Sequence, residues 1–169
     1  IALFIFAYLT QRLGGDQLLK VRVSEGRRLW SEVSRDSKRA AIYRKFKINC
    51  VHRHHNPQLD SAANKSLFGK CSELHGHEYF LEVGVSGVVD PATGLVMRRP
   101  AFDDWVNETL IQPYDKSYLN EILGNTSGEL IASRFFAELR SKLNNSLQLS
   151  LTVRETRKNS FLVCDEAFL

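Results

Sequence analysis

Cysteine is scarce in this sequence, and the few cysteines do not form a disulfide pattern. The 169 residues contain three cysteines, an odd number without paired spacing. A small secreted disulfide scaffold needs an even, closely spaced set. The sequence therefore excludes that class and favours a reducing compartment, and we expect a cytoplasmic protein.

The sequence also lacks an apolar run long enough to cross a membrane. Residues 1–9 are apolar, but a spanning helix needs about 20 such residues. No basic stretch precedes them, as it would in a secretory signal. We expect no membrane association. Because the chain begins at Ile1 rather than Met, we also expect it to start inside a longer protein.

Acidic side chains are sparse in the first part of the chain. Residues 1–47 hold 11 Lys/Arg and 4 Asp/Glu, a balance of +7, whereas the remainder holds 12 and 15, a balance of −3. Basic residues in this part could contact an anionic partner. They are Arg27, Arg28, Arg35, Lys38, Arg39, Arg44, Lys45 and Lys47. No nucleic-acid motif accompanies them, so we interpret them as a solvated face and expect no nucleic-acid partner.

The two ends of the sequence resemble each other at a shift of 130 residues. Residues 1–33 and 131–163 share 11 identities in 33 ungapped positions. Average residue usage gives about two. We interpret residues 1–35 as the last helix and two strands of an upstream repeat copy. Residues 40–169 are then one complete copy of a tandem protein.

Hydrophobic patterns predict the order β-β-α-α-β-β in the complete copy. Strands are expected at residues 42–52, 78–89, 147–156 and 160–165. Helices are expected from Pro100 to Pro113 and from about Gly128 to Leu143, and residues 56–70 are expected to form a loop. These elements predict an α+β fold, an antiparallel sheet with two helices on one face.

Three histidines end the apolar rows of two predicted strands. His75 and His77 lie two residues apart, so they point to the same face of a strand, and His52 ends the row of the preceding strand. Three imidazoles with one open position are typical of catalytic zinc, although imidazole also suits nickel, copper and iron. The alternatives are a closed structural site with Cys71 as fourth ligand, and satisfied histidines beside a buried thiol.

A thiol and two carboxylates complete the set of candidate residues. Beside an open metal position, with Lys70 next to it, the Cys71 thiolate could take a proton from carbon. Glu155 lies on the inward parity of its strand, so it needs a salt-bridge partner or a polar ligand, and Glu25 recurs at the matching repeat position. From its spacing, Asp115 is interpreted as a surface turn residue.

Four short segments together form a specific pattern. They are Leu67-Phe68-Gly69-Lys70-Cys71, the Cys71…His75-Gly76-His77 cluster, Asp90-Pro91-Ala92-Thr93-Gly94 and Val153-Arg154-Glu155-Thr156. With His52-Arg53, residues 42–165 resemble the 6-pyruvoyltetrahydropterin synthase and 6-carboxytetrahydropterin synthase family, which has the tunnelling fold.

This resemblance implies a metal centre with a catalytic pair beside it. His52, His75 and His77 would bind zinc, Cys71 would abstract the proton, and Asp115 would work with the cysteine. The substrate would be 7,8-dihydroneopterin triphosphate, and magnesium would help the triphosphate to leave. The product would be the 6-pyruvoyl pterin, or the 6-carboxy pterin in the sister enzyme.

The resemblance also implies a pterin pocket and an assembly. Glu155 would anchor the pterin through its ring nitrogens, and Glu129 would help at the pocket. The segment Thr126-Ser127-Gly128-Glu129 is one residue longer than the family pattern, which favours a helix-capping role for Glu129. A homo-oligomer is expected, either a trimer or hexamer or a pseudo-symmetric assembly of tandem copies.

The sequence departs from the family pattern at Lys116, where the family has a histidine that works with Asp115 and the cysteine. An ammonium with an ordinary pKa near 10.4 is a poor proton acceptor at neutral pH. The missing upstream copy could supply the histidine. The alternatives are therefore a working synthase and a degenerate half that binds zinc or pterin without turnover.

Overall fold

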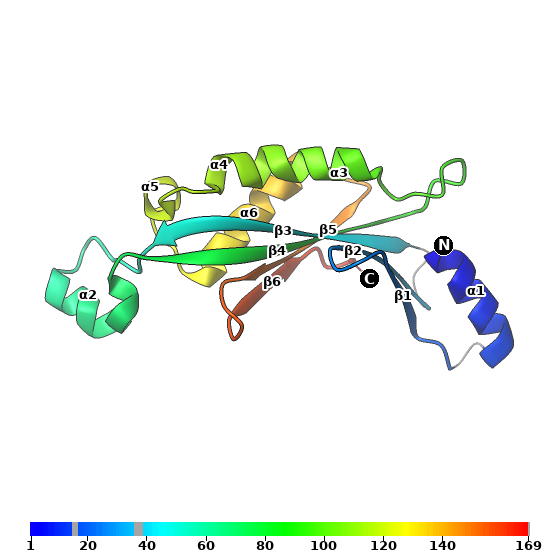
Figure 1. Ribbon diagram of the computed structural model, residues 1–169, viewed down its shortest axis with the longest axis horizontal. Coiled ribbons are helices and arrows are strands. Elements are labelled where there is room, and N and C mark those ends of the chain that lie inside the picture. Colours follow the sequence, from blue (N-terminus) through cyan, green and yellow to red (C-terminus); the bar gives the residue numbers. More distant parts are fainter. Residues whose placement is uncertain (15–16, 36–38, 169) are drawn as a thin grey trace.

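A single six-stranded antiparallel sheet forms the frame of the molecule (Figure 1). The computed structural model describes residues 1–14, 17–35 and 39–168. The strands follow one another in chain order: β1 (Lys20–Ser24), β2 (Leu29–Ser34), β3 (Ala40–His52), β4 (His75–Gly87), β5 (Gln148–Arg154) and β6 (Ser160–Cys164). The predicted α+β class and its antiparallel sheet are confirmed.

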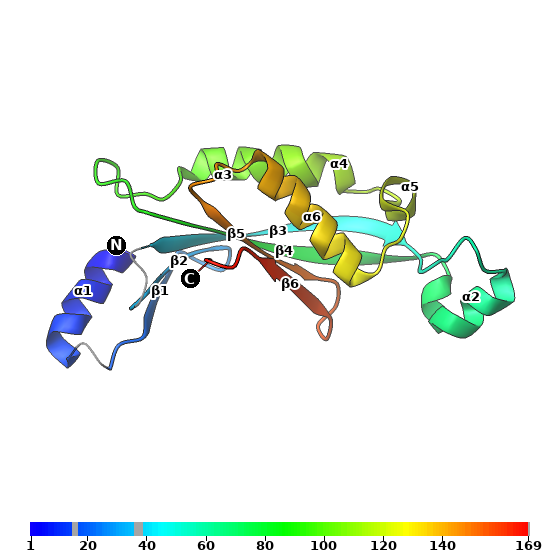
Figure 2. The same ribbon diagram turned by 180° about the vertical axis from the view of Figure 1, so that it is seen from behind.

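The helices lie mostly on one face of this sheet. They are α1 (Ala2–Leu13), α2 (Ser61–Phe68), α3 (Arg99–Val106), α4 (Gln112–Tyr114), α5 (Leu119–Leu123) and α6 (Gly128–Lys142), with a 3-10 turn η1 (Gly69–Ser72) and a π-helical turn η2 (Asn107–Ile111). Figure 2 shows α3, α4 and α6 crossing the same face. No helix among the described residues is long and apolar enough to span a bilayer. The cytoplasmic location stays a prediction.

Strands β3 and β4 are the longest elements and position the site. They pair over 13 residues, from Ala40 opposite Gly87 to His52 opposite His75. Along β4, buried Leu81, Val83 and Val85 alternate with residues that point to the helix-free face. Because strand side chains alternate with period two, one face joins the core. On the other face Phe80 is exposed, whereas Ser86 is buried.

The two long helices form as their sequences indicate. Pro100 lies in the first turn of α3, where its missing N–H costs nothing, and the Ser127 side chain accepts a hydrogen bond from Leu130 N to begin α6. The helix predicted from Pro100 to Pro113 is confirmed, since α3, η2 and α4 run without a break from Arg99 to Tyr114. Pro113 is tolerated there because the π-helical turn has already altered the hydrogen bonds.

One large core lies between the sheet and these helices. It contains fully buried side chains from β4, α3, α6 and β5, among them Leu81, Phe102, Phe135 and Leu151. Nineteen buried residues belong to it among those described. This packing holds the ends of β3 and β4 in place, since helices and strands share the same apolar contacts.

Residues 56–70 are not the loop that their polarity predicts. Residues 61–68 form α2, and the Asp60 side chain caps it by accepting a hydrogen bond from Ala63 N. Buried Asn64 donates to three backbone carbonyls around it. The helix is therefore stabilised by its N-terminal cap and by the hydrogen bonds of the buried Asn64 side chain rather than by an apolar stripe. Hydrophobic periodicity does not reveal such a helix.

The first 35 residues repeat the order of the last elements. The sequence α1-β1-β2 has the same helix-strand-strand order as α6-β5-β6, and β2 pairs with β3 from Leu29 opposite Arg44 to Val33 opposite Ala40. Ala2, Val33 and Ala40 form a second, small buried cluster. The assignment of residues 1–35 to an upstream copy stays a prediction.

Candidate metal centre

The register of β3 and β4 brings the three predicted histidines together. His52 ends β3, His75 begins β4 directly opposite it, and His77 lies two residues further on the same face. The ring centroids are 4.6 Å apart for His52 and His75, and 4.9 Å for His75 and His77. One ligand atom from each histidine lies within 4.8 Å of the others, a group that could hold a metal ion.

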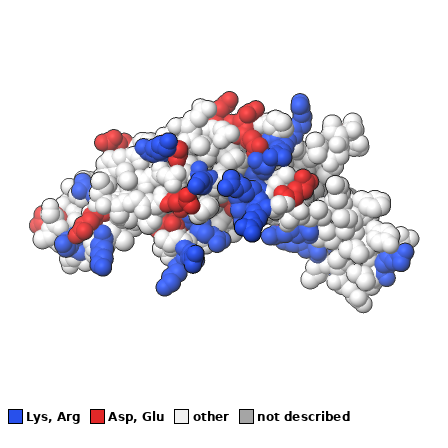
Figure 3. Space-filling model, in the orientation of Figure 1, with Lys and Arg blue, Asp and Glu red and all other residues white. Residues whose placement is uncertain are grey.

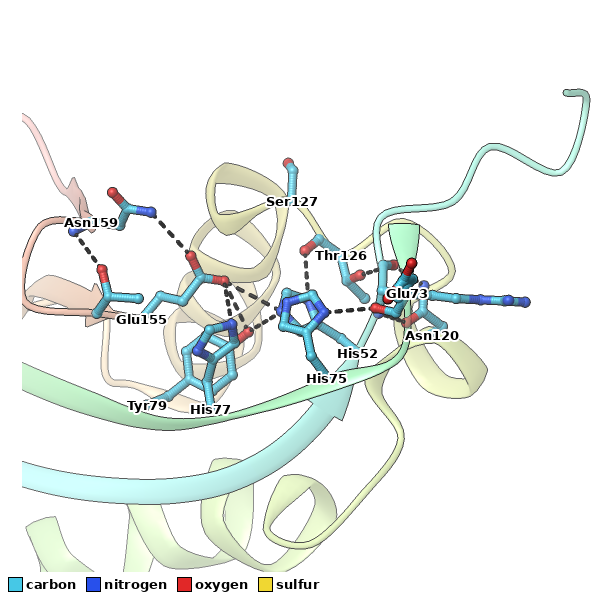
Figure 4. Close-up of polar contacts among 12 residues, drawn as sticks. His52, Glu73, His75, His77, Tyr79, Asn120, Thr126, Ser127, Glu155 and Asn159 are labelled. Carbon is cyan, nitrogen blue, oxygen red and sulfur yellow. Dashed lines mark hydrogen bonds and ion pairs between the residues drawn. The ribbon is translucent and has the colours of Figure 1, made fainter. Parts of the chain in front are cut away.

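Backbone carbonyls orient two of these rings (Figure 4). Nδ1 of His52 lies 3.2 Å from the Thr126 carbonyl oxygen, and Nδ1 of His75 lies 2.7 Å from the Glu73 carbonyl oxygen. A carbonyl only accepts hydrogen bonds, so each Nδ1 carries the hydrogen and each Nε2 is left with a lone pair. This is the arrangement of metal-binding histidines, and the donor set therefore fits zinc.

The Thr126 carbonyl is itself held by a small network around Arg53. The Asn120 side chain donates to the carbonyl oxygens of Arg53 and Gly124 and accepts from the Arg53 N–H, and the Thr126 hydroxyl donates to the Arg53 carbonyl oxygen. These contacts tie the end of β3 to the start of α6. The backbone carbonyl that orients the His52 ring is thus held in place by this network.

Glu155 points at the histidines from the turn after β5. Its Oε1 lies 3.4 Å from His52 Nε2 and 3.8 Å from His77 Nε2, and its side chain is 11% exposed. The buried Tyr79 hydroxyl donates to the same oxygen at 3.3 Å and lies 3.2 Å from His52 Nε2. The inward carboxylate predicted from strand parity therefore has partners in the histidine cluster.

Cys71 opens onto the same pocket as this cluster. The pocket has a volume of about 360 Å³. It is lined by His54, Lys70, Cys71, His75, His77, Glu155, Thr156 and Asn159. Cys71 is exposed on η1, directly before β4. A thiol, three imidazoles and a carboxylate therefore border one space large enough for part of a small molecule.

Burial keeps the central imidazoles neutral. It lowers the pKa of His52 to about 4, with the nearby His75 acting in the same direction. Burial also lowers the pKa of His77. Neutral imidazole is the form that binds metal, so at neutral pH these side chains need not lose a proton before they can coordinate.

The structure separates the buried thiol from the exposed one. Cys50 is 4% exposed, its Sγ–H donates to the Tyr114 carbonyl oxygen at 3.0 Å, and burial raises the pKa of its thiol to about 11. A thiol with such a pKa is inert near neutral pH. Of these two cysteines, only Cys71 faces the histidine pocket.

Two of the predicted site residues lie outside this pocket. Asp115 lies beside β3, where its Oδ1 accepts a hydrogen bond from Asn49 N at 2.8 Å. This hydrogen bond lowers the pKa of the Asp115 carboxyl. Lys116 lines another pocket, with a backbone φ of 61° that favours glycine or asparagine. Glu129 is exposed in the first turn of α6.

Sequence reasoning missed three contributors to the centre. Tyr79 shares the inward parity of His77, and that signal could have identified it. His54 stacks edge-on against His52 with centroids 5.6 Å apart. Thr126 acts through its backbone carbonyl, which no side-chain pattern reveals.

Comparison with known proteins places this arrangement in a family. The family model described as 6-pyruvoyl tetrahydropterin synthase matches residues 41–166. The chain is 31% identical over 127 residues to the 6-pyruvoyl tetrahydrobiopterin synthase of Poecilia reticulata, covering 70% of this chain and 85% of the relative. It is 33% identical over 88 residues to a putative 6-carboxy-5,6,7,8-tetrahydropterin synthase of Archaeoglobus fulgidus, covering 52% and 75%.

A solved structure agrees with these sequence matches. The structure of Caenorhabditis elegans 6-pyruvoyl tetrahydropterin synthase superposes with a TM-score of 0.68 and 31% sequence identity, covering 76% of this chain and 96% of that chain. The region that the family model matches contains β4 to β6, all of β3 except Ala40, and the three histidines. The chain therefore belongs to the 6-pyruvoyl tetrahydropterin synthase family.

Proposed function

We propose that this chain is a zinc-dependent synthase that converts 7,8-dihydroneopterin triphosphate to 6-pyruvoyl-tetrahydropterin with elimination of triphosphate. The observation that carries the proposal is the pocket in which Cys71, two of the three histidines and Glu155 meet, with His52 directly behind them. Family membership supplies the reaction class. Magnesium would accompany the triphosphate.

His52, His75 and His77 would hold the zinc ion. Zinc bound there would supply Lewis-acid polarisation of substrate hydroxyl or carbonyl oxygens. The hydrogen bonds from Nδ1 of His52 and His75 to backbone carbonyls support this assignment, because they leave Nε2 available.

Cys71 would remove and return protons on the side chain of the substrate. Its exposure on η1 and its place in the pocket support this role. Glu155 would bind the pterin ring nitrogens. Asn159 Nδ2 lies 3.4 Å from Glu155 Oε2 and would help to orient that carboxylate.

A second copy would complete the site in a homo-oligomer. Asp115 and Lys116 lie on the outer edge of β3, away from the pocket that contains Cys71. Among the described residues the outer strands of the sheet are β1 and β6, and the outer edge of each could pair with a strand of another chain. We propose that a neighbouring chain brings its own 115–116 segment, or a histidine in its place, to Cys71.

The direct test is mass spectrometry of the products after zinc-loaded protein has been given 7,8-dihydroneopterin triphosphate and magnesium. A 6-pyruvoyl product supports the proposal. A 6-carboxy product instead assigns the chain to the sister activity, which the similarity to the Archaeoglobus fulgidus relative makes the second candidate. Unchanged substrate with zinc bound would contradict both.

The role of Cys71 is tested by Cys71→Ser, with Cys164→Ser as the control because Cys164 is also exposed but lies on β6. Loss of a general base lowers kcat by about 100-fold or more. We expect that loss for Cys71→Ser with zinc content unchanged, and no loss for the control. Equal activity of the two variants would remove Cys71 from the mechanism.

A degenerate half that binds zinc or pterin without turnover is the third candidate, and Lys116 is the residue that favours it. The variant Lys116→His restores a titratable imidazole at that position, which accepts protons near neutral pH. A large gain in turnover would identify a handicapped enzyme. Full activity of the unmodified chain would exclude the degenerate half.

A further inference from the structure

A second concave site lies on the helix-free face of the sheet, opposite the histidines. It is a groove of about 380 Å³ over β3, β4 and β5. On this face Lys45 is opposite Glu82, Lys47 is opposite Phe80, and Phe80 is opposite Arg154. Their neighbours Ile48 and Tyr79 belong to the core on the other face. The groove is therefore separated from the metal centre by the thickness of the sheet.

The lining of this groove is strongly basic. Its six basic residues are Arg27, Arg28, Lys45, Lys47, Arg154 and Arg157, against the single carboxylate of Glu82. Figure 3 shows Lys and Arg side chains gathered over the middle of the molecule. A hollow lined by one sign of charge concentrates ions of the opposite sign.

Carboxylates neutralise only part of this charge. Lys45 Nζ lies 3.4 Å from Glu82 Oε2, and Lys47 Nζ lies 2.7 Å from Glu78 Oε2. The four arginines of the groove make no ion pair with any other residue in the described part of the chain. Guanidinium groups bind phosphate oxygens in a bidentate manner, so four unpaired arginines suit several phosphates better than one carboxylate.

Three of the four arginines lie in two hairpin turns that correspond in the internal repeat, and Arg154 is the last residue of β5. Arg27 lies in the turn between β1 and β2, and Arg157 lies in the turn between β5 and β6, 130 residues later. The continuous sheet places these turns on either side of β3 and β4. The groove therefore exists because the first 35 residues pair with the rest of the sheet, and the two turns contribute one pair of equivalent residues, Arg27 and Arg157.

We propose that this groove binds a short chain of linked phosphates, either free or carried by a small molecule. Its volume suits a small ligand, and the Phe80 ring, 44% exposed, offers an apolar surface beside the arginines. The proposal is independent of the synthase reaction, because the histidine pocket uses the other face.

The probe is tripolyphosphate, titrated calorimetrically into the metal-free protein without magnesium, with orthophosphate for comparison. We expect saturable 1:1 binding, at least about tenfold tighter than orthophosphate because several guanidinium groups act together, and weaker as salt rises. A parallel titration with ATP distinguishes a free chain from one that carries a ring, which would gain affinity on Phe80.

The test variant is the double substitution Arg27→Gln/Arg157→Gln, which removes one positive charge from each of the two hairpin turns that border the groove. The matched control is Arg12→Gln/Lys158→Gln, which removes the same charge from exposed residues outside the groove. We expect at least a tenfold loss of affinity in the first and less than a twofold loss in the second. Circular dichroism checks that both variants are folded.

Three results would overturn the proposal. One is an equal loss in both double variants, which would show only general attraction by net charge. Another is loss of binding in His77→Ala, which would put the anion in the histidine pocket. The third is binding of an oligonucleotide that depends on Arg27 and Arg157 when tripolyphosphate does not bind at all.

Discussion

The chemistry of this protein depends on a few polar side chains that are held where the sheet meets the helices. His52 is fully buried, yet both of its ring nitrogens have polar neighbours, the Thr126 carbonyl at Nδ1 and the Tyr79 hydroxyl at Nε2. Buried polar groups without partners are costly. The site is therefore ordered before any ligand binds.

Burial of His52 predicts an acid-sensitive fold in the metal-free protein. Its pKa is lowered from 6.5 to about 4 in the folded chain, so between these values the unfolded chain takes up a proton that the folded chain does not. The free energy of unfolding should therefore fall by roughly 3 kcal/mol as the pH drops from 6.5 to 4. Urea titrations at several pH values measure it.

The contribution of His52 to the pH dependence of stability can be distinguished from that of the carboxylates. Hydrogen bonds lower the pKa values of Asp90 and Asp115 below 3.8, so these groups reduce stability mainly at pH values below that window. His52→Asn should flatten the dependence above pH 4. A stability that is constant or rises between pH 6.5 and 4 would show that His52 titrates normally.

The metal centre itself is tested by comparing two histidines of one pocket. His77 belongs to the three-histidine group, whereas His54 lines the same pocket but lies outside that group. Removing one of three ligands should lower zinc affinity by at least about tenfold in His77→Ala, while His54→Ala should change it little. Competition with a chelator, followed by metal analysis, gives both affinities. Equal affinities would mean that zinc binds elsewhere.

At the scale of elements, α6 is the support that the site and the core share. Its start follows Thr126, which orients His52, and its inner face buries Ile131, Phe135 and Leu139 against the sheet. A shift of this helix would move the Thr126 carbonyl. Packing and site geometry are therefore coupled through one element.

Truncating a large side chain on the inner face of α6 should therefore strongly lower the free energy of unfolding. Phe135 is fully buried and its ring packs against Tyr114 with centroids 4.6 Å apart, so Phe135→Ala should lower the free energy of unfolding by about 3 to 5 kcal/mol. Leu130→Ala on the same helix, where the side chain is 48% exposed, should cost less than about 1 kcal/mol. Chemical denaturation compares them, and similar losses would contradict the assigned inner face.

At the scale of the whole molecule, one sheet joins two unequal cores. The main core has nineteen buried residues among those described, and the cluster around Ala2, Val33 and Ala40 has three. On α1 several large apolar side chains are exposed, including Phe4 at 76%. The first 35 residues therefore bury less apolar surface than the main core, with Trp30 as their largest buried side chain, and rely more on the pairing of β2 with β3.

This imbalance predicts that the first part of the chain unfolds before the rest. The chain has two tryptophans, Trp30 on β2 and Trp105 on α3, so Trp105→Phe and Trp30→Phe leave one reporter in each part. The fluorescence of Trp30 should change at lower denaturant concentration than that of Trp105. Coincident transitions would show that the sheet unfolds as a single cooperative unit.

Much of the site could be predicted from the sequence because its signals are local. Period-two alternation alone indicates that His52, His75, His77 and inward Glu155 end buried rows. The helical stripe and the cap at Ser127 likewise identified α6. The α2 helix was missed because its polar surface lacks a stripe and its stability comes from Asp60 and Asn64.

Backbone periodicity alone was enough to place the four strands and two long helices of residues 40–169 in order and to assign the histidines and Glu155 to the inward face. Which of the candidate residues meet depends on the folded chain. Strand register sets His52 opposite His75, the turn after β5 carries Glu155 to them, and the path beside β3 keeps Asp115 away from Cys71. Those distances depend on pairing and packing between residues far apart in the chain, which no local pattern encodes.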